Sequence, residues 1–181
     1  MIQEPRVEAP DAASRSASVR PAVRGKSLDV GNQKLTVKGV TYGPFGPEPN
    51  GGFDPETVAS DFKRMTAVGI NAVRLYSPPE RWLLDLAEAH GLLVMVGLPC
   101  EQHIAFLDER GRSAAIEQII RTAVRQMAGH PAVLCYAVGN EIPASIVRWH
   151  GRQRVERFIT RLCRAAREED STALITYVNF P

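Results

Sequence analysis

The stretch from His130 to Pro143, HPAVLCYAVGNEIP, decides the class of fold. Pro131 keeps the residue before it out of helical geometry, so a helix has to end there. The apolar run from Ala132 to Val138 is typical of a strand that is buried on both faces, as in a parallel sheet. The run ends in the polar pair Asn140–Glu141, and the carboxyl ends of such strands are where parallel α/β folds build their active sites.

An acid at the end of a buried strand is costly unless it has a task or a partner. The functional interpretation makes Glu141 a catalytic carboxylate and Asn140 its substrate-binding neighbour. The alternative is an acid at the start of the next helix, where it complements the helix dipole. The spacing of these residues alone does not decide between the two.

The amino-acid composition limits the classes of function that the chain can have. The chain has 181 residues, of which 44% are hydrophobic and 23% charged, as in an ordinary globular domain with one core. A net charge of +2 gives no reason to expect nucleic acid as a partner. No apolar run approaches the roughly 20 residues of a membrane span, and no secretory leader is evident, so we expect a cytoplasmic location. Three cysteines, an odd number, do not suggest a disulfide framework.

Residues 1–24 are rich in Pro, Ala, Ser and Arg and lack apolar periodicity, so we expect a disordered basic arm or linker. Gly31-Asn32 then separates two short segments, Ser27–Val30 and Lys34–Val37, as in a tight β-hairpin. From residue 25 to residue 181 the chain is expected to form one domain.

Beyond the hairpin, apolar strands alternate with amphipathic helices, which predicts right-handed βα units and a parallel sheet. Asp54 followed by Pro55 is a good helix start, for example. The expected strands are Gly39–Gly43, Ile70–Tyr76, Leu92–Val96, Ala132–Val138 and Ala173–Val178, and the last expected helix covers Ala144–Glu169. The fold class is therefore α/β, a parallel (β/α) TIM-barrel type that is incomplete, with about five of the eight βα units. No glycine-rich phosphate-binding motif follows any strand.

Three stretches together resemble the barrel domain of clan A glycoside hydrolases. They are GINAVRLY, with Arg74, then LLDLAEAHG, and then HPAVLCYAVGNEIP, with Asn140 and Glu141. The chain looks most like the family that contains β-galactosidases, β-glucuronidases and β-mannosidases. The resemblance covers roughly Lys38 to Pro181, the first five βα steps.

The resemblance implies a role for each matching residue. Glu141 matches the general acid/base, and burial gives such a carboxyl the raised pKa that a proton donor needs. Asn140 would hydrogen-bond the sugar 2-hydroxyl, and Arg74 matches the arginine that lies beside the nucleophile. The substrate would be a β-glycoside or polysaccharide, and no cofactor is implied.

The departures from the family pattern limit what the chain can do alone. The family's nucleophile is a glutamate at the end of a seventh strand, which this sequence does not supply, whereas a retaining enzyme needs two carboxyls about 5–5.5 Å apart. We therefore expect the chain alone to be inactive. The outer strands of an incomplete sheet are unpaired edges, which favour self-association.

Three further residues near strand ends are candidate sugar ligands. Glu101 and His103 lie in the loop after the third strand, and Tyr42 ends the first strand, where packing is an equal alternative. Cys100 beside Glu101 and His103 falls short of the four ligands that structural zinc takes. Two alternative functions remain open, a non-catalytic carbohydrate-binding or assembly module, and a β-glucan transglycosylase part of a polysaccharide-synthesis protein. An aldolase or isomerase would require a lysine at a strand end, and none is present.

Overall fold

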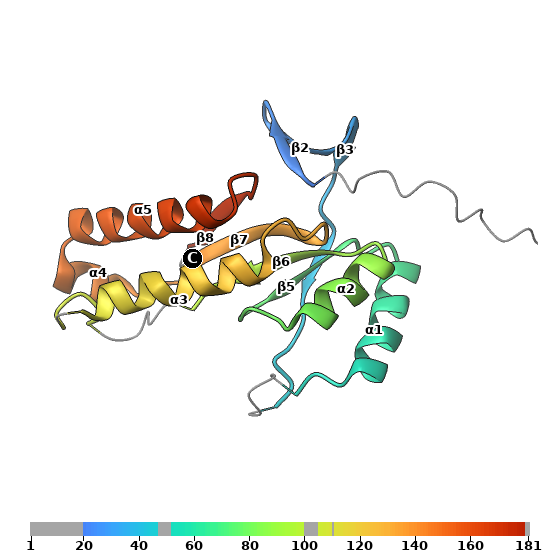
Figure 1. The fold of residues 1–181 in the computed structure, drawn as a ribbon, viewed down its shortest axis with the longest axis horizontal. Coiled ribbons are helices and arrows are strands. Elements are labelled where there is room, and N and C mark those ends of the chain that lie inside the picture. The colour runs from blue at the N-terminus through green and yellow to red at the C-terminus, as the bar shows by residue number, and fades with distance from the viewer. Residues whose placement is uncertain (1–19, 47–51, 100–104, 110, 180–181) are drawn as a thin grey trace, which may run out of the picture.

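The computed structural model of the protein describes residues 20–46, 52–99, 105–109 and 111–179. Its centre is a parallel sheet whose strands follow one another in space as they do along the chain (Figure 1). The strands are β4 (Gly39–Thr41), β5 (Ala72–Leu75), β6 (Leu93–Gly97), β7 (Val133–Asn140) and β8 (Ile175–Val178). This order confirms the predicted (β/α) arrangement of TIM-barrel type and leaves β4 and β8 as the edges of the sheet.

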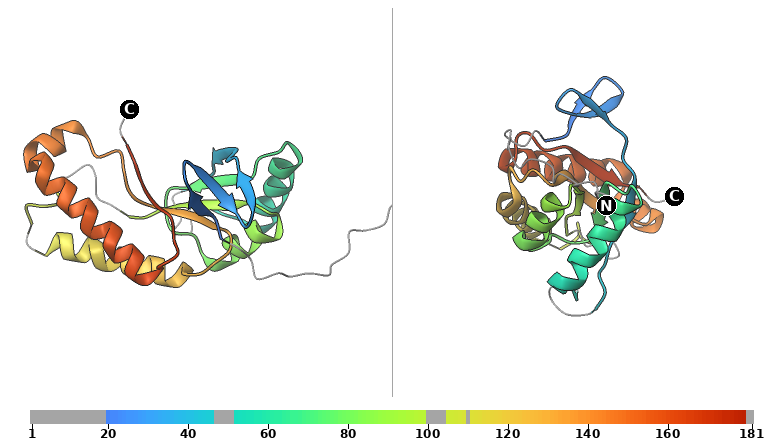
Figure 2. Two further views of the ribbon diagram at one scale, coloured as in Figure 1. Left: turned by 90° about the horizontal axis from the view of Figure 1, so that it is seen from above. Right: turned by 90° about the vertical axis from the view of Figure 1, so that its right-hand side faces the viewer.

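Helices connect successive strands and cover one face of the sheet (Figure 1, Figure 2). They are α1 (Pro55–Ala67), α2 (Arg81–Ala89), α3 (Arg112–Met127), the short α4 (Ala144–His150) and α5 (Arg152–Glu169). Burial alternates along β6, where Val94 and Val96 are buried and Met95 between them is partly exposed. Val94 and Val96 belong to the hydrophobic core. In the described part of the chain, no helix is both long and apolar enough to cross a membrane.

The start of α1 follows the sequence prediction. Asp54 is its N-cap, and the Asp54 carboxylate accepts a hydrogen bond from the Thr57 amide at 2.9 Å. The last predicted helix is instead divided in two. Gly151 has φ +83° and ψ 133°, which no helical residue adopts, so α4 ends and α5 begins around it.

A small antiparallel sheet precedes the barrel strands. It consists of β1 (Ala22–Arg24), β2 (Ser27–Val30) and β3 (Gln33–Leu35), where the sequence predicted a hairpin of two strands. The predicted disordered arm, residues 1–24, is therefore too long at its C-terminal end, because β1 pairs with β2 and Arg24 forms an ion pair with Asp29 at 3.2 Å. Residues 1–19 lie outside the described part of the chain.

Arg20 fastens the segment before β1 to the far end of the chain. Its guanidinium contacts both carboxylate oxygens of Asp170, at 2.8 and 2.7 Å, just after α5. The Asp170 carboxylate also accepts hydrogen bonds from the Gly129 amide at 3.2 Å and the Tyr136 hydroxyl at 3.3 Å. This buried cluster ties together the ends of α3 and α5, β7 and the N-terminal segment.

Candidate active site

The C-terminal end of β7 departs from regular strand geometry. The pairing of β7 with β8 shifts register between Ala137 and Asn140, as in a β-bulge. Gly139 has φ +151°, and a Cβ atom there would approach the Tyr177 ring to 2.9 Å. A residue with a side chain would therefore be strained at this position, so glycine allows the strand end to bend against β8.

The bend places Glu141 in an uncommon backbone conformation. Its φ is +50°, and among the described residues it is the only one other than glycine with a positive φ. Such a conformation costs about 1–3 kcal/mol and is concentrated at functional sites. The Glu141 amide is held by a hydrogen bond to the Val178 carbonyl at 2.8 Å.

Tyr177, on β8, supports the same turn from a second direction. The Ile142 amide donates a hydrogen bond to the Tyr177 hydroxyl at 3.0 Å, and Ile142 is buried. The turn that carries Glu141 is thus fastened to β8 on both sides. Sequence reasoning missed Tyr177, because only the register of β7 against β8 reveals which residue meets the turn.

Arg74 and Asn140 are brought together from strands that are not neighbours. Arg74 lies on β5, and its Nη2 donates a short hydrogen bond to Oδ1 of Asn140 at the end of β7. The Arg74 guanidinium also lies over the Tyr76 ring, 4.8 Å from its centroid. Because arginine has only donors, the amide of Asn140 is oriented with its NH2 group available to donate elsewhere.

Gly97, at the end of the intervening strand β6, permits close approach of the β5 backbone. A Cβ atom on Gly97 would lie 2.8 Å from the Leu75 carbonyl oxygen. Any larger residue would push the end of β5, with Arg74 and Tyr76, away from β6. The contact between Arg74 and Asn140 thus bridges the ends of β5 and β7 across β6, and Glu141 directly follows Asn140 in the chain.

Tyr42 is not part of this group. Its side chain is buried, with 4% exposed, on the helix-covered face of the sheet against Phe62 of α1. Its hydroxyl donates to the Asp61 carboxylate at 2.9 Å, and burial together with this contact raises the Tyr42 pKa. The structure thus places Tyr42 in the core, the packing alternative considered from the sequence, and we leave it out of the proposed sugar site.

Two further sugar-binding candidates, Glu101 and His103, lie outside the described residues, as does Cys100. Within the described ranges, no group of three His, Cys, Asp or Glu side chains is placed to hold a metal ion. The candidate site therefore consists of Arg74, Asn140 and Glu141. Gly97, Gly139 and Tyr177 support the backbone around it.

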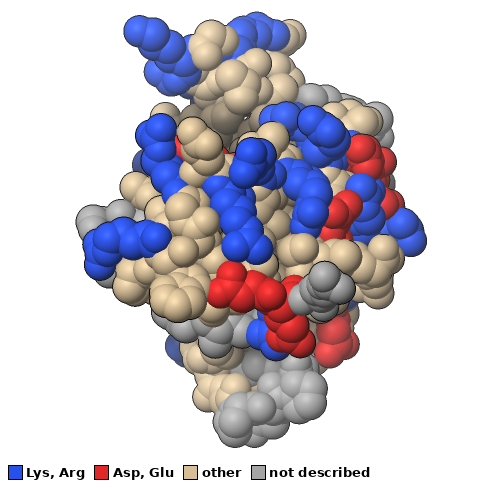
Figure 3. Space-filling view, turned by 90° about the vertical axis from the view of Figure 1, so that its left-hand side faces the viewer, with Lys and Arg blue, Asp and Glu red and all other residues tan. Residues whose placement is uncertain are grey.

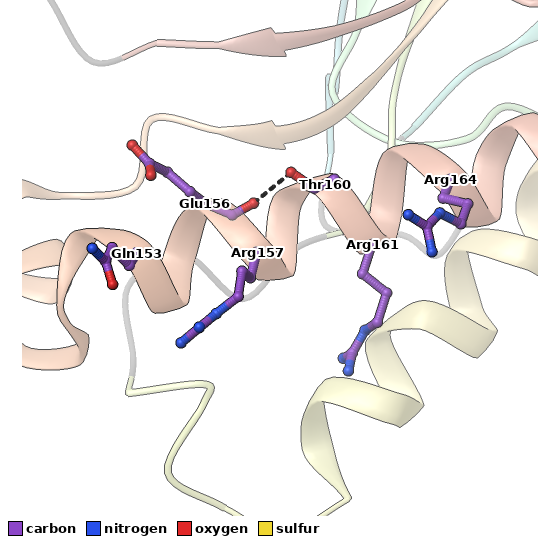
Figure 4. A pocket seen from close by; sticks show the side chains of 6 residues that line it. All are labelled: Gln153, Glu156, Arg157, Thr160, Arg161 and Arg164. Carbon is purple, nitrogen blue, oxygen red and sulfur yellow. Dashed lines mark hydrogen bonds between the residues drawn. The ribbon is translucent and has the colours of Figure 1, made fainter.

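A surface hollow of about 510 Å³ lies away from the strand ends, on the outer surface of α5. Its lining residues all come from α5, and their side chains spread along one side of the helix (Figure 4): Gln153, Glu156, Arg157, Thr160, Arg161 and Arg164. Lys and Arg side chains gather over the end of the molecule where α4 and α5 meet (Figure 3). Arg161 forms an ion pair with Glu117 of α3 at 3.0 Å, so part of this charged face is paired between the two helices.

Comparison of the fold with solved structures finds glycoside hydrolases. The chain is similar to a β-glucuronidase from Bacteroides uniformis, with a TM-score of 0.67 and 21% sequence identity over 82% of this chain. It is also similar to a β-glucuronidase from Ruminococcus gnavus in complex with a C6-substituted uronic isofagomine, with a TM-score of 0.67 and 17% identity over 84% of this chain. At these identities the likeness shows a common fold. The chain spans 19% and 26% of the two enzymes, respectively.

No curated protein matches the chain in sequence. Residues 22–180, however, match the family described as "Glycosyl hydrolases family 2, TIM barrel domain". This match includes β1 to β8 and all the residues of the site built above. It agrees with the resemblance that the strand-end residues carry, and the chain therefore belongs to the TIM-barrel domain family of family 2 glycosyl hydrolases.

Proposed function

We propose that this chain supplies the acid/base half of a glycoside hydrolase active site, with Glu141 as the general acid/base. The single observation that supports this most is the contact between Arg74 and Asn140, which joins the ends of β5 and β7 beside Glu141. The positive φ at Glu141 adds to it, because strained backbone conformations of this kind are concentrated at functional sites.

Glu141 would protonate the glycosidic oxygen as the leaving group departs and then deprotonate the attacking water, as in retaining hydrolysis. Asn140 would donate from its amide NH2 to a sugar hydroxyl, since Arg74 already occupies its oxygen. That hydrogen bond would strengthen in the oxocarbenium-like transition state.

Arg74 would hold the nucleophile ionised, since a neighbouring cation lowers the pKa of a carboxyl. Among the described residues Arg74 forms no ion pair, and its guanidinium meets only the Asn140 amide and the Tyr76 ring. The nucleophile would come from a seventh strand outside residues 1–181, so we expect no hydrolysis by these residues alone. The proposed substrate is a β-glycoside or polysaccharide, and the cytoplasmic location stays a prediction.

The sugar site is tested on the chain itself by NMR titration with methyl β-glycosides of glucose, galactose, mannose and glucuronic acid. We expect amide shift changes at Arg74, Asn140 and Glu141 with at least one of them, and loss of these changes in Asn140→Ala. Arg24→Ala, a change in the small N-terminal sheet, is the matched control and should bind as the unaltered chain does. If no glycoside moves these amides, the proposed function is wrong.

A second function is favoured by the absence of an acidic partner for Arg74 in the described part of the chain. Without a second carboxylate the strand ends can bind a sugar but not cleave it. A carbohydrate-binding or assembly module would bind the methyl glycosides equally well. As a binding module it would catalyse no hydrolysis, so no activity would depend on Glu141, in contrast to the glycosidase.

A further inference from the structure

Three exposed aromatic side chains belong to segments that follow strands of the parallel sheet. In the described ranges, the exposed aromatic residues are Phe45, Tyr76 and Trp149, and their exposed fractions are 60%, 50% and 72%. Phe45 follows β4, Tyr76 follows β5 directly, and Trp149 belongs to α4, which follows β7. Because the strands are parallel, each of these three segments begins at the C-terminal end of its strand, the end of the sheet that also carries Glu141.

Trp149 is exposed yet fixed in orientation. Its Nε1 donates a short hydrogen bond to the Asp108 carboxylate, in the loop between β6 and α3. Asp108 also accepts a hydrogen bond from Arg154 of α5 at 3.3 Å, and its Oδ1 lies 3.4 Å from Nδ1 of buried His150. Arg154 donates in addition to the Leu107 carbonyl. The loop and the start of α5 therefore hold the indole in place together.

Such an arrangement suits a ligand that offers both apolar and polar groups. The indole N–H is already bonded, so the exposed part of the ring is left for apolar contact. A pyranose ring presents C–H groups on its faces and hydroxyls around its edge. The hydroxyls could bond to Asp108 and Arg154, beside the indole. Because the indole is fixed beforehand, little side-chain entropy would be lost on binding.

The position of Trp149 sets the length of that ligand. Most of the helix α4 lies between Glu141 and Trp149 along the chain, and its seven residues span ~10 Å. A ligand that contacts both Glu141 and Trp149 is therefore longer than a single sugar unit, as an oligosaccharide is.

We propose that Trp149 is the stacking platform of a distal subsite for a β-linked oligosaccharide, one or more sugar units away from the unit at Glu141. This deepens the proposed function and rests on it for the class of ligand. A protein segment is the other occupant that an exposed indole could have, and it is an outcome of the test.

Tryptophan fluorescence reports on the subsite without any need for activity. The chain has two tryptophans, Trp82 and Trp149, so Trp82→Phe leaves Trp149 as the only source of indole emission. This variant is titrated with β-linked tetrasaccharides of glucose, galactose and mannose, and separately with the corresponding methyl glycosides. We expect a saturable emission change with at least one tetrasaccharide and none with the methyl glycosides.

Affinity for the responding tetrasaccharide is then measured by calorimetry in the unaltered chain and its variants. Trp149→Ala should weaken binding roughly 3- to 10-fold, and Trp149→Phe should restore part of it. Val68→Ala, which removes an exposed apolar side chain after α1, is the matched control and should have no effect. Circular dichroism checks that each variant is folded.

The outcomes separate this proposal from the proposed function. If methyl glycosides shift the amides of Arg74 and Asn140 but no tetrasaccharide changes the emission of Trp149, the distal subsite alone is wrong. If a tetrasaccharide is bound at Trp149 while the methyl glycosides leave those amides unmoved, the site at Glu141 is wrong. An emission change with anilinonaphthalene sulfonate and with no sugar would assign the indole to an apolar partner and overturn the subsite.

Discussion

Replacing Tyr177 with Phe removes one oxygen atom and leaves the Ile142 amide without its acceptor. Ile142 is buried, with 4% exposed, so water replaces the lost hydrogen bond poorly. An unsatisfied buried N–H costs about 1–3 kcal/mol. Glu141 stores about 1–3 kcal/mol of backbone strain, part of which is released once the turn is free to relax. We therefore expect Tyr177→Phe to lower the free energy of unfolding by about 1–2 kcal/mol and to weaken sugar binding as well.

The measurement combines urea unfolding with hydrogen exchange of the Ile142 amide and the methyl glycoside titration. Tyr136→Phe is the matched control, because it also removes a buried hydroxyl from a hydrogen bond. That hydrogen bond is to Asp170, which precedes β8 and so lies away from the C-terminal strand ends. Both variants should lose stability, but only Tyr177→Phe should speed exchange at Ile142 and weaken binding. Unchanged exchange and unchanged sugar affinity in Tyr177→Phe would refute the idea that Tyr177 holds the turn.

Two further predictions concern the strand ends and the N-terminal attachment. Gly97→Ala should separate the ends of β5 and β6, with a loss of about 1–3 kcal/mol in unfolding free energy by urea titration and of glycoside binding at Arg74. A variant that is destabilised but binds normally would contradict this. Burial by itself raises the pKa of Asp170, but hydrogen bonds from Arg20 and the Gly129 amide outweigh it and keep this pKa below its usual range. The resulting stabilisation is present above roughly pH 4, the ordinary carboxyl pKa, and is lost as the pH falls through the lower pKa of the folded state. Arg20→Ala should therefore destabilise the chain by about 2 kcal/mol at pH 7 and much less at pH 2, as measured by thermal unfolding at both values. Equal losses at the two pH values would show that the ion pair is not the cause.

Sequence patterns predicted the regular parts of the fold because apolar periodicity and capping residues act locally. The predicted bounds of each parallel strand lie within a few residues of the observed ones. Asp54 caps α1, as predicted from its side-chain carboxylate. The break at Gly151 was missed, because the amphipathic pattern continues across it. The strand β1 was missed because its residues are exposed and are held by pairing with β2.

The site was only partly accessible from the sequence for a related reason. Arg74, Asn140 and Glu141 could be chosen because each comes at the end of a predicted strand. Tyr42 also ends a strand, yet it points to the helices, since one residue of register exchanges the two faces of a sheet. The strain at Glu141 and its support by Tyr177 arise from contacts between β7 and β8, which no local pattern encodes.

The most direct test of the account is the effect of Glu141→Gln on turnover, in a polypeptide where residues 1–181 form part of a complete barrel. Aryl β-glycosides whose phenol leaving groups differ in acidity are compared. A general acid matters most for poor leaving groups, so we predict a loss of about 10²–10⁴-fold for these and a far smaller loss for activated ones. Equal losses for both kinds of leaving group would contradict the assignment of Glu141 as the acid.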